Sequence, residues 1–421
     1  MSNSNYLLKK SEVLNILSSE GCAFLTGGAG SGKSYMLRDI AKDFRHTIML
    51  APTGLSAVNI GGQTIHKFLG IRTSLFSPVE VARNIKNNKS FNNIIHNTDL
   101  IIIDEVSMCT PIILDALDEV LRTITGKPCV FGGKKVLFCG DLAQLPPVVR
   151  EEEAKILMQE FGYKDMSPTS SNVFKDVTMI ELEGTYRQRD DIEYYEVLRD
   201  LRNAIMGNGI FKDVEKSVRL LNQQCMGNRY RSDMTVLVYT NKEAKKINDM
   251  WMSSGKGDLV TYPSKIIGSW KDGNSRAMEN LSIKPGARVT CIANIGGVVN
   301  GDTGIVLSLG VDNISIRVDR TSEIESINPY TWESYDYSYD PNFGIIKKIT
   351  GTMTQFPLLL SYAHTVHSSQ GSTLKGVFIP NPDRMNAALI YVALSRATKI
   401  DDVGLSYPLS EYKFSFKFIQ R

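Results

Sequence analysis

The sequence is poor in cysteine and has none of the spacings that bind zinc or build a disulfide framework. Its 421 residues include 6 cysteines, which are scattered and form no C-x-x-C pair. The net charge is also small, at +3, so a nucleic-acid partner would need a local basic groove, because the overall charge would not attract it. No run reaches about 18 apolar residues, and the N-terminus lacks the order of basic and then apolar residues that marks a signal peptide. We therefore expect a soluble protein of a reducing compartment, cytoplasmic or inside a host cell, with no membrane partner.

Up to about residue 280, short apolar runs alternate with segments of helical spacing. The runs expected to be buried strands are Cys22–Gly27, Thr47–Thr53, Leu100–Glu105 and Lys135–Asp141. Such alternation is typical of a parallel sheet covered by helices on both faces. Near Thr178 the pattern starts again with Met179–Leu182, which predicts a second α/β lobe.

The character changes between residues 283 and 355. Short β-branched runs are separated by Gly, Asn and Asp turns, which is typical of a small β-barrel. The aromatic and acidic segment Thr331–Asp340 is expected to be a loop of this barrel, and the α/β pattern returns at Pro357. The predicted fold is therefore α/β, with two RecA-like, doubly wound parallel-sheet lobes and an inserted β-barrel.

This organisation gives a set of expected boundaries. They are residues 1–70 and 99–178 for the first lobe, 71–98 for a small insertion, 179–282 and 356–421 for the second lobe, and 283–355 for the barrel.

Gly27-Gly-Ala-Gly-Ser-Gly-Lys-Ser34 matches the phosphate-loop pattern G-x-x-x-x-G-K-[ST]. It follows an apolar strand and opens a helix, which is the context that the motif requires. Backbone N–H groups would then face phosphates. Lys33 would contact the β- and γ-phosphate oxygens, and the Ser34 hydroxyl would hold Mg²⁺. The alternative is a glycine-rich turn without a ligand. The residues expected to bind the nucleotide here are Gly27, Gly28, Ala29, Gly30, Ser31, Gly32, Lys33 and Ser34.

Asp104 and Glu105 end the apolar run that begins at Leu100. Asp104 is expected to hold Mg²⁺ through water, and Glu105 to orient or deprotonate the attacking water. Two carboxylates at a solvated strand end are the alternative interpretation. The Asp-Glu pair favours hydrolysis of a nucleoside triphosphate over phosphoryl transfer to a small molecule.

Further motifs resemble those of the superfamily-1B DNA helicases, in the Pif-type, RecD-like branch to which the phage Dda group is related. The matching stretches begin with Ala51–Phe68, Leu114–Arg122 and Phe138–Val148, and continue in the same order with Leu182–Gln188, Ala363–Gly371 and Tyr391–Ala397. The resemblance implies two lobes with ATP in the cleft between them and movement in the 5′-to-3′ direction. One departure is that no glutamine precedes Gln63. The family has an adenine-reading glutamine near the place of Lys9 and Lys10, so the base specificity stays open.

The resemblance also implies roles for residues in these motifs. Arg187 and Arg396 would stabilise the γ-phosphate from the second lobe, as arginine fingers do; a surface ion pair is the alternative. Gln144 would contact the γ-phosphate or the attacking water, and Asp141 would hold the strand end or support a neighbouring contact. Gln370 and Gly371 would couple strand contact to the nucleotide.

The same motifs predict a track for single-stranded DNA, in which hydroxyls, imidazoles and amines contact phosphates and sugars without reading bases. The candidates are Thr53, Thr64, His66 and Lys67 on the first lobe, and Thr365, His367 and Ser369 on the second. The histidines could instead be satisfied interior residues. Phe76 and Phe91 are candidates for splitting the base-pair junction, with packing in a local core as the alternative.

The predicted function is that of an ATP-dependent 5′-to-3′ DNA helicase that uses ATP and Mg²⁺. Its expected partners are single-stranded and forked DNA, with replication or recombination proteins, and it is expected to act as a monomer. The alternative function is that of a translocase or remodelling ATPase that moves on a single strand without unwinding.

Overall fold

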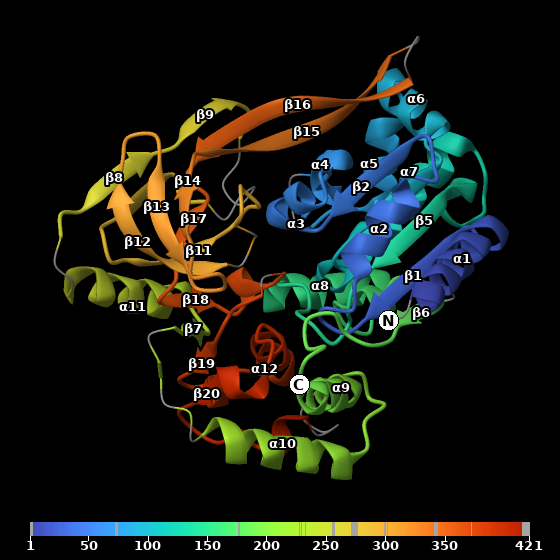
Figure 1. The fold of residues 1–421 in the computed structure, drawn as a ribbon. Helices are drawn as coiled ribbons and strands as arrows, with labels where there is room; N and C mark the ends of the chain where they lie inside the picture. Colours follow the sequence, from blue (N-terminus) through green and yellow to red (C-terminus); the bar gives the residue numbers. More distant parts are fainter. Residues whose placement is uncertain are drawn as a thin grey trace. The chain divides into compact units, whose positions relative to one another are not determined.

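The computed structural model describes residues 3–71, 75–175, 177–226, 228, 230–231, 233–254, 257–270, 277–298, 300, 302–340, 344–371 and 373–414. The chain forms two compact units (Figure 1). Unit 1 contains Met1–Gly184, Gly268–Ser275 and Glu333–Thr352, and unit 2 contains Thr185–Ile267, Arg276–Trp332 and Met353–Arg421. Within the described residues, no helix is both long and apolar enough to cross a membrane.

Unit 1 is built on a parallel sheet with the strand order β3-β2-β4-β5-β1-β6. Its strands are β1 (Cys22–Gly27), β2 (Thr47–Ala51), β3 (Gln63–Thr64), β4 (Leu100–Ile103), β5 (Lys135–Cys139) and β6 (Thr178–Leu182). Successive side chains of a strand point to opposite faces, and both faces of this sheet are covered. The predicted parallel α/β lobe is confirmed. Strands β2, β4 and β5 each end two residues before the end of the apolar run that predicted them.

Helices α1 (Asn3–Ser19) and α2 (Lys33–Ala41) pack on one face of this sheet, around Leu25, Ile102 and Leu137. The opposite face carries α7 (Pro111–Thr125). The remaining helical segments of the unit are α3 (Gly54–Asn59), α4 (Ile65–Phe68), α5 (Pro78–Lys86), α6 (Lys89–Asn97), η1 (Val106–Met108), η2 (Val130–Gly133), α8 (Glu151–Phe161) and η3 (Pro168–Ser170). The expected insertion at 71–98 contains α5 and α6, and both pack against α7; residues 72–74 lie outside the described part.

Strand β6 corrects the expected start of the second lobe. Met179–Leu182 was assigned to that lobe, but Thr178–Leu182 pairs in parallel with Ala23–Gly27 of β1. An apolar run indicates a buried strand, but it does not say which sheet the strand joins. The first sheet therefore extends to Leu182.

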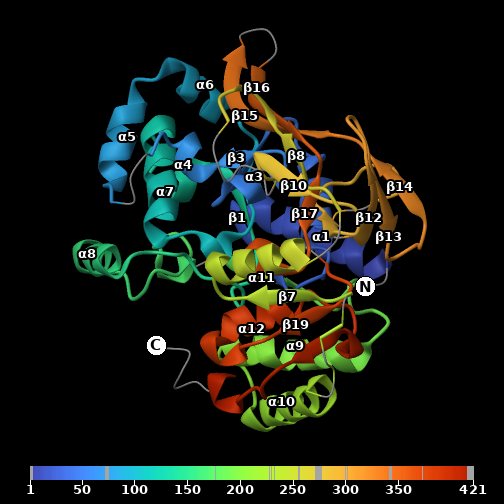
Figure 2. The same cartoon turned by 90° about the vertical axis from the view of Figure 1, so that its left-hand side faces the viewer.

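Unit 2 contains a second parallel sheet, with the order β18-β7-β19-β20. Its strands are β7 (Thr235–Val238), β18 (Ala363–Thr365), β19 (Val377–Ile379) and β20 (Val403–Leu405). The helical segments around it are α9 (Ile192–Ile205), α10 (Phe211–Cys225), α11 (Asn241–Ser254), η4 (His367–Ser369), η5 (Pro382–Arg384), α12 (Ala387–Leu394), η6 (Ile400–Asp402) and η7 (Glu411–Phe414). Asp191 caps α9 by accepting from the N–H of Tyr194 at 2.9 Å, and α9 packs against α12 (Figure 2).

The chain between β7 and β18 forms antiparallel sheets, as expected of the insertion. A five-stranded sheet has the order β14-β13-β12-β11-β17, beside the pair β10-β8 and the set β15-β16-β9. The strands are β8 (Val260–Pro263), β9 (Lys265–Gly268), β10 (Asn280–Ile283), β11 (Arg288–Cys291), β12 (Thr303–Leu309), β13 (Ile314–Val318), β14 (Ile324–Ile327), β15 (Tyr330–Asp340), β16 (Gly344–Gln355) and β17 (Leu358–Leu360).

Two expectations about this region need correction. Antiparallel pairing begins at Val260, before the expected boundary at residue 283. Thr331–Asp340, expected to be a loop, lies in strand β15. Its alternating tyrosines favour a strand through their β-propensity, and the acidic residues of the segment, Glu333, Asp336 and Asp340, hid that signal.

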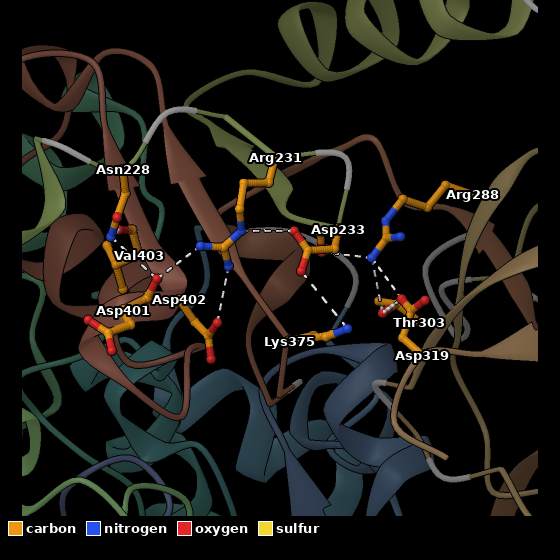
Figure 3. Close-up of polar contacts among 10 residues, drawn as sticks. All are labelled: Asn228, Arg231, Asp233, Arg288, Thr303, Asp319, Lys375, Asp401, Asp402 and Val403. Atoms are coloured by element: carbon orange, nitrogen blue, oxygen red, sulfur yellow. Dashed lines mark hydrogen bonds and ion pairs between the residues drawn. The ribbon is translucent and has the colours of Figure 1, made fainter. Parts of the chain in front are cut away.

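A polar network joins the insertion to the second parallel sheet within unit 2 (Figure 3). Arg288 of β11 is 5% exposed; it donates to the backbone O of Asp233 at 2.7 Å and pairs with Asp319 at 2.8 Å. Arg231 binds Asp233 and Asp402, each at 3.1 Å. Removing one member of a buried ion pair leaves an uncompensated charge, so these contacts tie the insertion to the residues before β7.

The family-like stretch Leu114–Arg122 lies in α7 and holds a turn at Phe131 and Gly132. Asp118 of α7 accepts from the N–H of Phe131 at 2.5 Å. Phe131 and Gly132 both have a left-handed backbone, with φ of 53° and 58°. A Cβ at Gly132 would lie 2.2 Å from Oγ1 of Thr125 and 2.6 Å from the carbonyl O of Leu121.

We predict that Gly132→Ala lowers the melting temperature more than Gly126→Ala does. Both glycines have a left-handed backbone, but a Cβ at Gly126, with φ of 70°, has nothing within 4 Å. The backbone strain is therefore shared, and the difference reports the clash, which costs about 1–3 kcal/mol and shifts melting by roughly 5 °C. Thermal unfolding followed by circular dichroism measures it. Equal melting temperatures would show that the turn relaxes around the added methyl group.

Candidate functional site

The phosphate loop joins β1 to α2 in unit 1. Gly32, with φ of 96°, is the N-cap of α2 in a left-handed conformation, and Lys33 begins the helix. Because the first N–H groups of a helix lack intrahelical partners, this end of α2 can bind an anion. Glycine is required at Gly32 because its backbone adopts a conformation that costs other residues about 1–2 kcal/mol.

Two side chains of the loop fit a phosphate ligand. The Lys33 ammonium donates to the carbonyl oxygens of Gly27 and Gly28, at 2.7 and 3.0 Å, so its charge lies at the loop. Ser31 is 2% exposed, and its Oγ has no hydrogen-bond partner in the described structure. A buried hydroxyl without a partner is costly, and a phosphate oxygen in the loop would satisfy it.

Asp104 follows the last residue of β4 and is 7% exposed. Burial raises its pKa, whereas the N–H of Glu105, the charge of Lys33 and the thiol of Cys139 act in the opposite direction. Glu105 has a left-handed backbone, with φ of 52°; such strain is uncommon outside functional sites. The pair therefore lies where the sequence placed it, with Asp104 beside the lysine of the phosphate loop.

These residues also fit a magnesium ion. Ser34 is an exposed residue at the start of α2, and Asp104 is a buried carboxylate that interacts with the charge of the neighbouring Lys33. Within the described residues, no three or more His, Cys, Asp or Glu side chains gather into a metal site of their own. Mg²⁺ keeps several waters and is usually held by one or two protein ligands together with phosphates, so this sparse donor set suits it.

The turn after β5 holds Gln144 in place. Asp141 is fully buried; its carboxylate accepts from the N–H of Ala143 at 3.3 Å and from Nε2 of Gln144 at 3.3 Å. Gln144 is 7% exposed. Asp141 thus supports a neighbouring contact, which is one of the roles that the sequence left open for it.

Arg187 and Arg396 lie together in unit 2, on either side of Ser395. Arg187 donates through Nε to Oγ1 of Thr373 at 3.0 Å and through a terminal nitrogen to the carbonyl O of Ser395 at 2.8 Å. Arg396 donates to Oγ of Ser395 at 2.8 Å and to the carbonyl O of Val392 at 2.9 Å. Burial, and then the charge of Arg396, lower the pKa of Arg187 to about 9, so the Arg187 guanidinium remains charged at neutral pH.

Gln188 is a residue of this cluster that the sequence analysis missed. It is fully buried, donates to the carbonyl O of Ala397 at 2.7 Å and accepts from the hydroxyl of Thr185 at 2.8 Å. The same hydroxyl accepts from the N–H of Arg187 at 3.1 Å. Gln188 therefore fixes the turn that carries Arg187 against the segment that carries Arg396. Its place beside Arg187 in the family-like motif was the available signal.

The residues of unit 1 that were predicted to contact single-stranded DNA lie in the family-like stretch Ala51–Phe68. Thr53 and Thr64 cap α3 and α4, each accepting a backbone N–H at 3.2 Å. His66 is partly buried, and burial lowers its pKa, which favours the neutral imidazole. Lys67 donates to the hydroxyl of Thr350 in β16 at 3.3 Å. The threonines thus shape the backbone that carries His66 and Lys67.

The strand candidates of unit 2 divide into exposed and buried residues. His367 is exposed, and Thr365, 6% exposed, accepts from the N–H of Ser368 at 3.2 Å. Ser369 is fully buried and donates to the carbonyl O of Val366 at 2.8 Å. Ser369 was predicted to contact DNA; here its hydroxyl is used in the interior, where it helps to form the turn η4. The backbone O of Ser369 accepts from Arg396 at 3.4 Å, so this motif contacts the arginine cluster.

Gln370 and Gly371 follow this turn. Gln370 is partly buried, and Gly371 has a left-handed backbone with φ of 78° and open space around its missing Cβ. The coupling role predicted for them stays a prediction.

Phe76 and Phe91 both pack into cores of unit 1. Each is partly buried against the cluster under α7, and the ring of Phe91 lies 4.9 Å from that of Phe68. The packing interpretation therefore accounts for their positions, and a role in splitting base pairs stays a prediction.

Comparisons with known proteins agree with these motifs. The family described as PIF1-like helicase matches residues 10–216, and the UvrD-like helicase C-terminal domain matches residues 360–399. The ATP-dependent DNA helicase Pif1 of Campylobacter jejuni is 28% identical, over 94% of this chain and 90% of the relative. The helicase PIF1 of Candida albicans is 26% identical over 89% of this chain, which spans about half (51%) of that relative.

Solved structures give the same result. Pif1 of Bacteroides sp in complex with ADP-AlF4 has a TM-score of 0.87 at 29% identity, over 98% of this chain and 95% of that one. Bacteroides Pif1 bound to single-stranded DNA is 30% identical, with a TM-score of 0.64, over 96% and 93% of the two chains. Since both lobes and every motif fall within these matches, the chain belongs to the family of Pif1-like helicases.

Proposed function

We propose that this ATP-dependent DNA helicase moves 5′ to 3′ along single-stranded DNA and unwinds the duplex ahead of it. The observation that carries the proposal is the pair of charged guanidiniums around Ser395 in unit 2, in a chain whose unit 1 holds the phosphate loop. A protein that binds ATP only as a structural ligand needs neither these arginines nor Glu105. The direction of movement is inherited from the family.

In the proposed chemistry, Lys33 contacts the β- and γ-phosphates and Ser31 donates to a phosphate oxygen. Mg²⁺, held by Ser34 and through water by Asp104, would neutralise charge on the phosphates when bound. Glu105 accepts the proton of the attacking water, and Gln144 orients that water or contacts the γ-phosphate. Hydrogen bonds from Ala143 and Gln144 to Asp141 fix this glutamine before the reaction.

Arg187 and Arg396 would stabilise the charge that spreads over the transferring phosphoryl oxygens. Their neighbours orient both groups: Thr373 and Ser395 bind Arg187, and Ser395 also binds Arg396. Preorganised charge of this kind needs no rearrangement at the moment of reaction. Loss of the γ-phosphate removes the partner of both arginines, which would release the two lobes for the next step.

We also propose that His66 and Lys67 in unit 1 and His367 in unit 2 contact the strand, with Thr53, Thr64 and Thr365 shaping their backbone. Lys67 is already within hydrogen-bonding distance of a hydroxyl, and contacts of this kind suit phosphates and sugars. Bacteroides Pif1 has been solved with single-stranded DNA and at forked DNA, and we propose the same two partners here.

A translocase that does not unwind is the second candidate. The packing of Phe76 and Phe91 favours it, because these were the aromatic side chains proposed to split the junction. The motor residues would be the same in both cases, so unwinding must be measured directly.

Arg187→Ala is predicted to lower the turnover of ATP by roughly 10³-fold, as loss of an arginine finger does, while nucleotide affinity changes little. Arg396→Lys should give a similar loss, because lysine keeps the buried charge but not the planar fork. Steady-state hydrolysis with saturating single-stranded DNA measures both. Arg219→Ala is the control, since Arg219 is exposed and pairs with Glu215 of the same helix. Normal turnover in Arg187→Ala, with an unchanged melting temperature, would remove the finger role.

Strand separation on tailed duplexes tests direction and unwinding together. A duplex with a 5′ single-stranded tail should be unwound in the presence of ATP, and one with a 3′ tail should not. Unwinding from the 3′ tail alone would reverse the proposed direction. If neither substrate is unwound while DNA-dependent hydrolysis persists, the translocase is the correct function.

A further inference from the structure

Two tyrosines lie beside the phosphate loop without a role in the chemistry described above. Tyr35 follows Ser34 directly, in the first turn of α2, and is 69% exposed. The rings of Tyr35 and Tyr6 of α1 have their centroids 5.7 Å apart, at 59°. The Tyr6 hydroxyl donates to Asp39 at 3.0 Å, which fixes this ring against α2.

Tyr35 lies on the solvent side of α2, because Met36, Leu37 and Ile40 of this helix are buried. Helical side chains tilt toward the N-terminus of their helix, and that end of α2 is the end that would hold the phosphates. A nucleoside that extends from the loop along the solvent side of α2 would therefore lie close to the ring of Tyr35.

Two lysines of α1 near Tyr6, Lys9 and Lys10, already form ion pairs with carboxylates of this unit. The Lys10 ammonium lies one helical turn after Tyr6; it binds Asp39 and Asp43, each at 2.9 Å, and the carbonyl O of Asp39 at 3.4 Å. Lysine has three N–H donors, and these three oxygens satisfy all of them. Lys9 pairs with Glu12 at 3.1 Å. Neither lysine has the role of reading the edge of a base.

We propose that the base of the nucleotide stacks on the face of Tyr35, held by Tyr6, and is not read along its hydrogen-bonding edge. Every base has a π-face, so stacking tolerates base identity. The substrate class of the site is then nucleoside triphosphates whatever their base, with ATP and GTP bound alike. The inference rests on the proposed function, because it requires the triphosphate to be bound by Lys33 and Ser31.

Equilibrium binding of ADP and GDP tests this, with each nucleotide labelled on its ribose by a fluorescent methylanthraniloyl group and followed by anisotropy. The two dissociation constants of the wild-type protein should agree within about threefold. Tyr35→Ala should weaken both equally, by roughly tenfold, the usual effect of losing one stacked base. Tyr35→Trp should retain binding, since it keeps an aromatic face.

Matched controls separate this inference from the proposed function. Tyr407 is 57% exposed in unit 2, and Tyr407→Ala should leave both constants unchanged. Lys33→Ala should abolish binding of both nucleotides, because it removes the phosphate contact. An ADP affinity more than about thirtyfold above that for GDP, or an unchanged affinity in Tyr35→Ala, overturns the inference and leaves the phosphate loop standing. Absence of binding to either nucleotide in the wild-type protein overturns both.

Discussion

A triphosphate carries several negative charges, and the loop between β1 and α2 in unit 1 can bind them through Lys33 and the N–H groups at the start of α2. β1 lies between β5 and β6 in the sheet, and β4 pairs with the far side of β5. In a parallel sheet the carboxyl ends of the strands share one edge, where ligands bind. The phosphate loop, the Asp104–Glu105 pair and the turn of Asp141 and Gln144 follow β1, β4 and β5 for that reason. Residues more than 100 positions apart in the sequence thus belong to one site.

Unit 2 carries charge of the opposite sign, on Arg187 and Arg396. Two guanidiniums near each other repel, and burial depresses the pKa of Arg187 to about 9. Backbone and hydroxyl oxygens of Ser395, Val392 and Thr373 offset part of that cost. A cluster of buried positive charge gains most when an anion reaches it, which in our account is the γ-phosphate. Binding energy and hydrolysis are then linked by the same two side chains.

Much of this arrangement could be predicted from the sequence because its signals are local. A phosphate loop is a contiguous pattern, and Asp104–Glu105 ends an apolar run, so both were found with their strands. Membership of a sheet is not local, which is why β6 was given to the wrong lobe. Burial of single side chains is also set by tertiary packing. Ser369 lies in a motif that resembles a strand contact, yet its hydroxyl bonds to Val366. Phe91 has the aromatic character of a wedge, yet it packs on Phe68.

In the insertion, tertiary pairing also decided the secondary structure of a whole segment, which the sequence had predicted wrongly. The acidic residues of Thr331–Asp340 favoured a loop, but the segment pairs with β16 as a strand. Gln188 was missed although it lies beside Arg187 in the family-like motif, because a glutamine has no composition signal for burial; its contacts with Thr185 and Ala397 define its role.

In our account, the protein hydrolyses bound ATP rapidly only when single-stranded DNA is bound as well. The most direct measurement is the rate of ATP hydrolysis by the wild-type protein as single-stranded DNA is added. Our account predicts a rise of at least about tenfold that saturates with DNA, since strand contact must favour the transition state by more than 1 kcal/mol to drive movement. A rate that stays the same at every DNA concentration would contradict it.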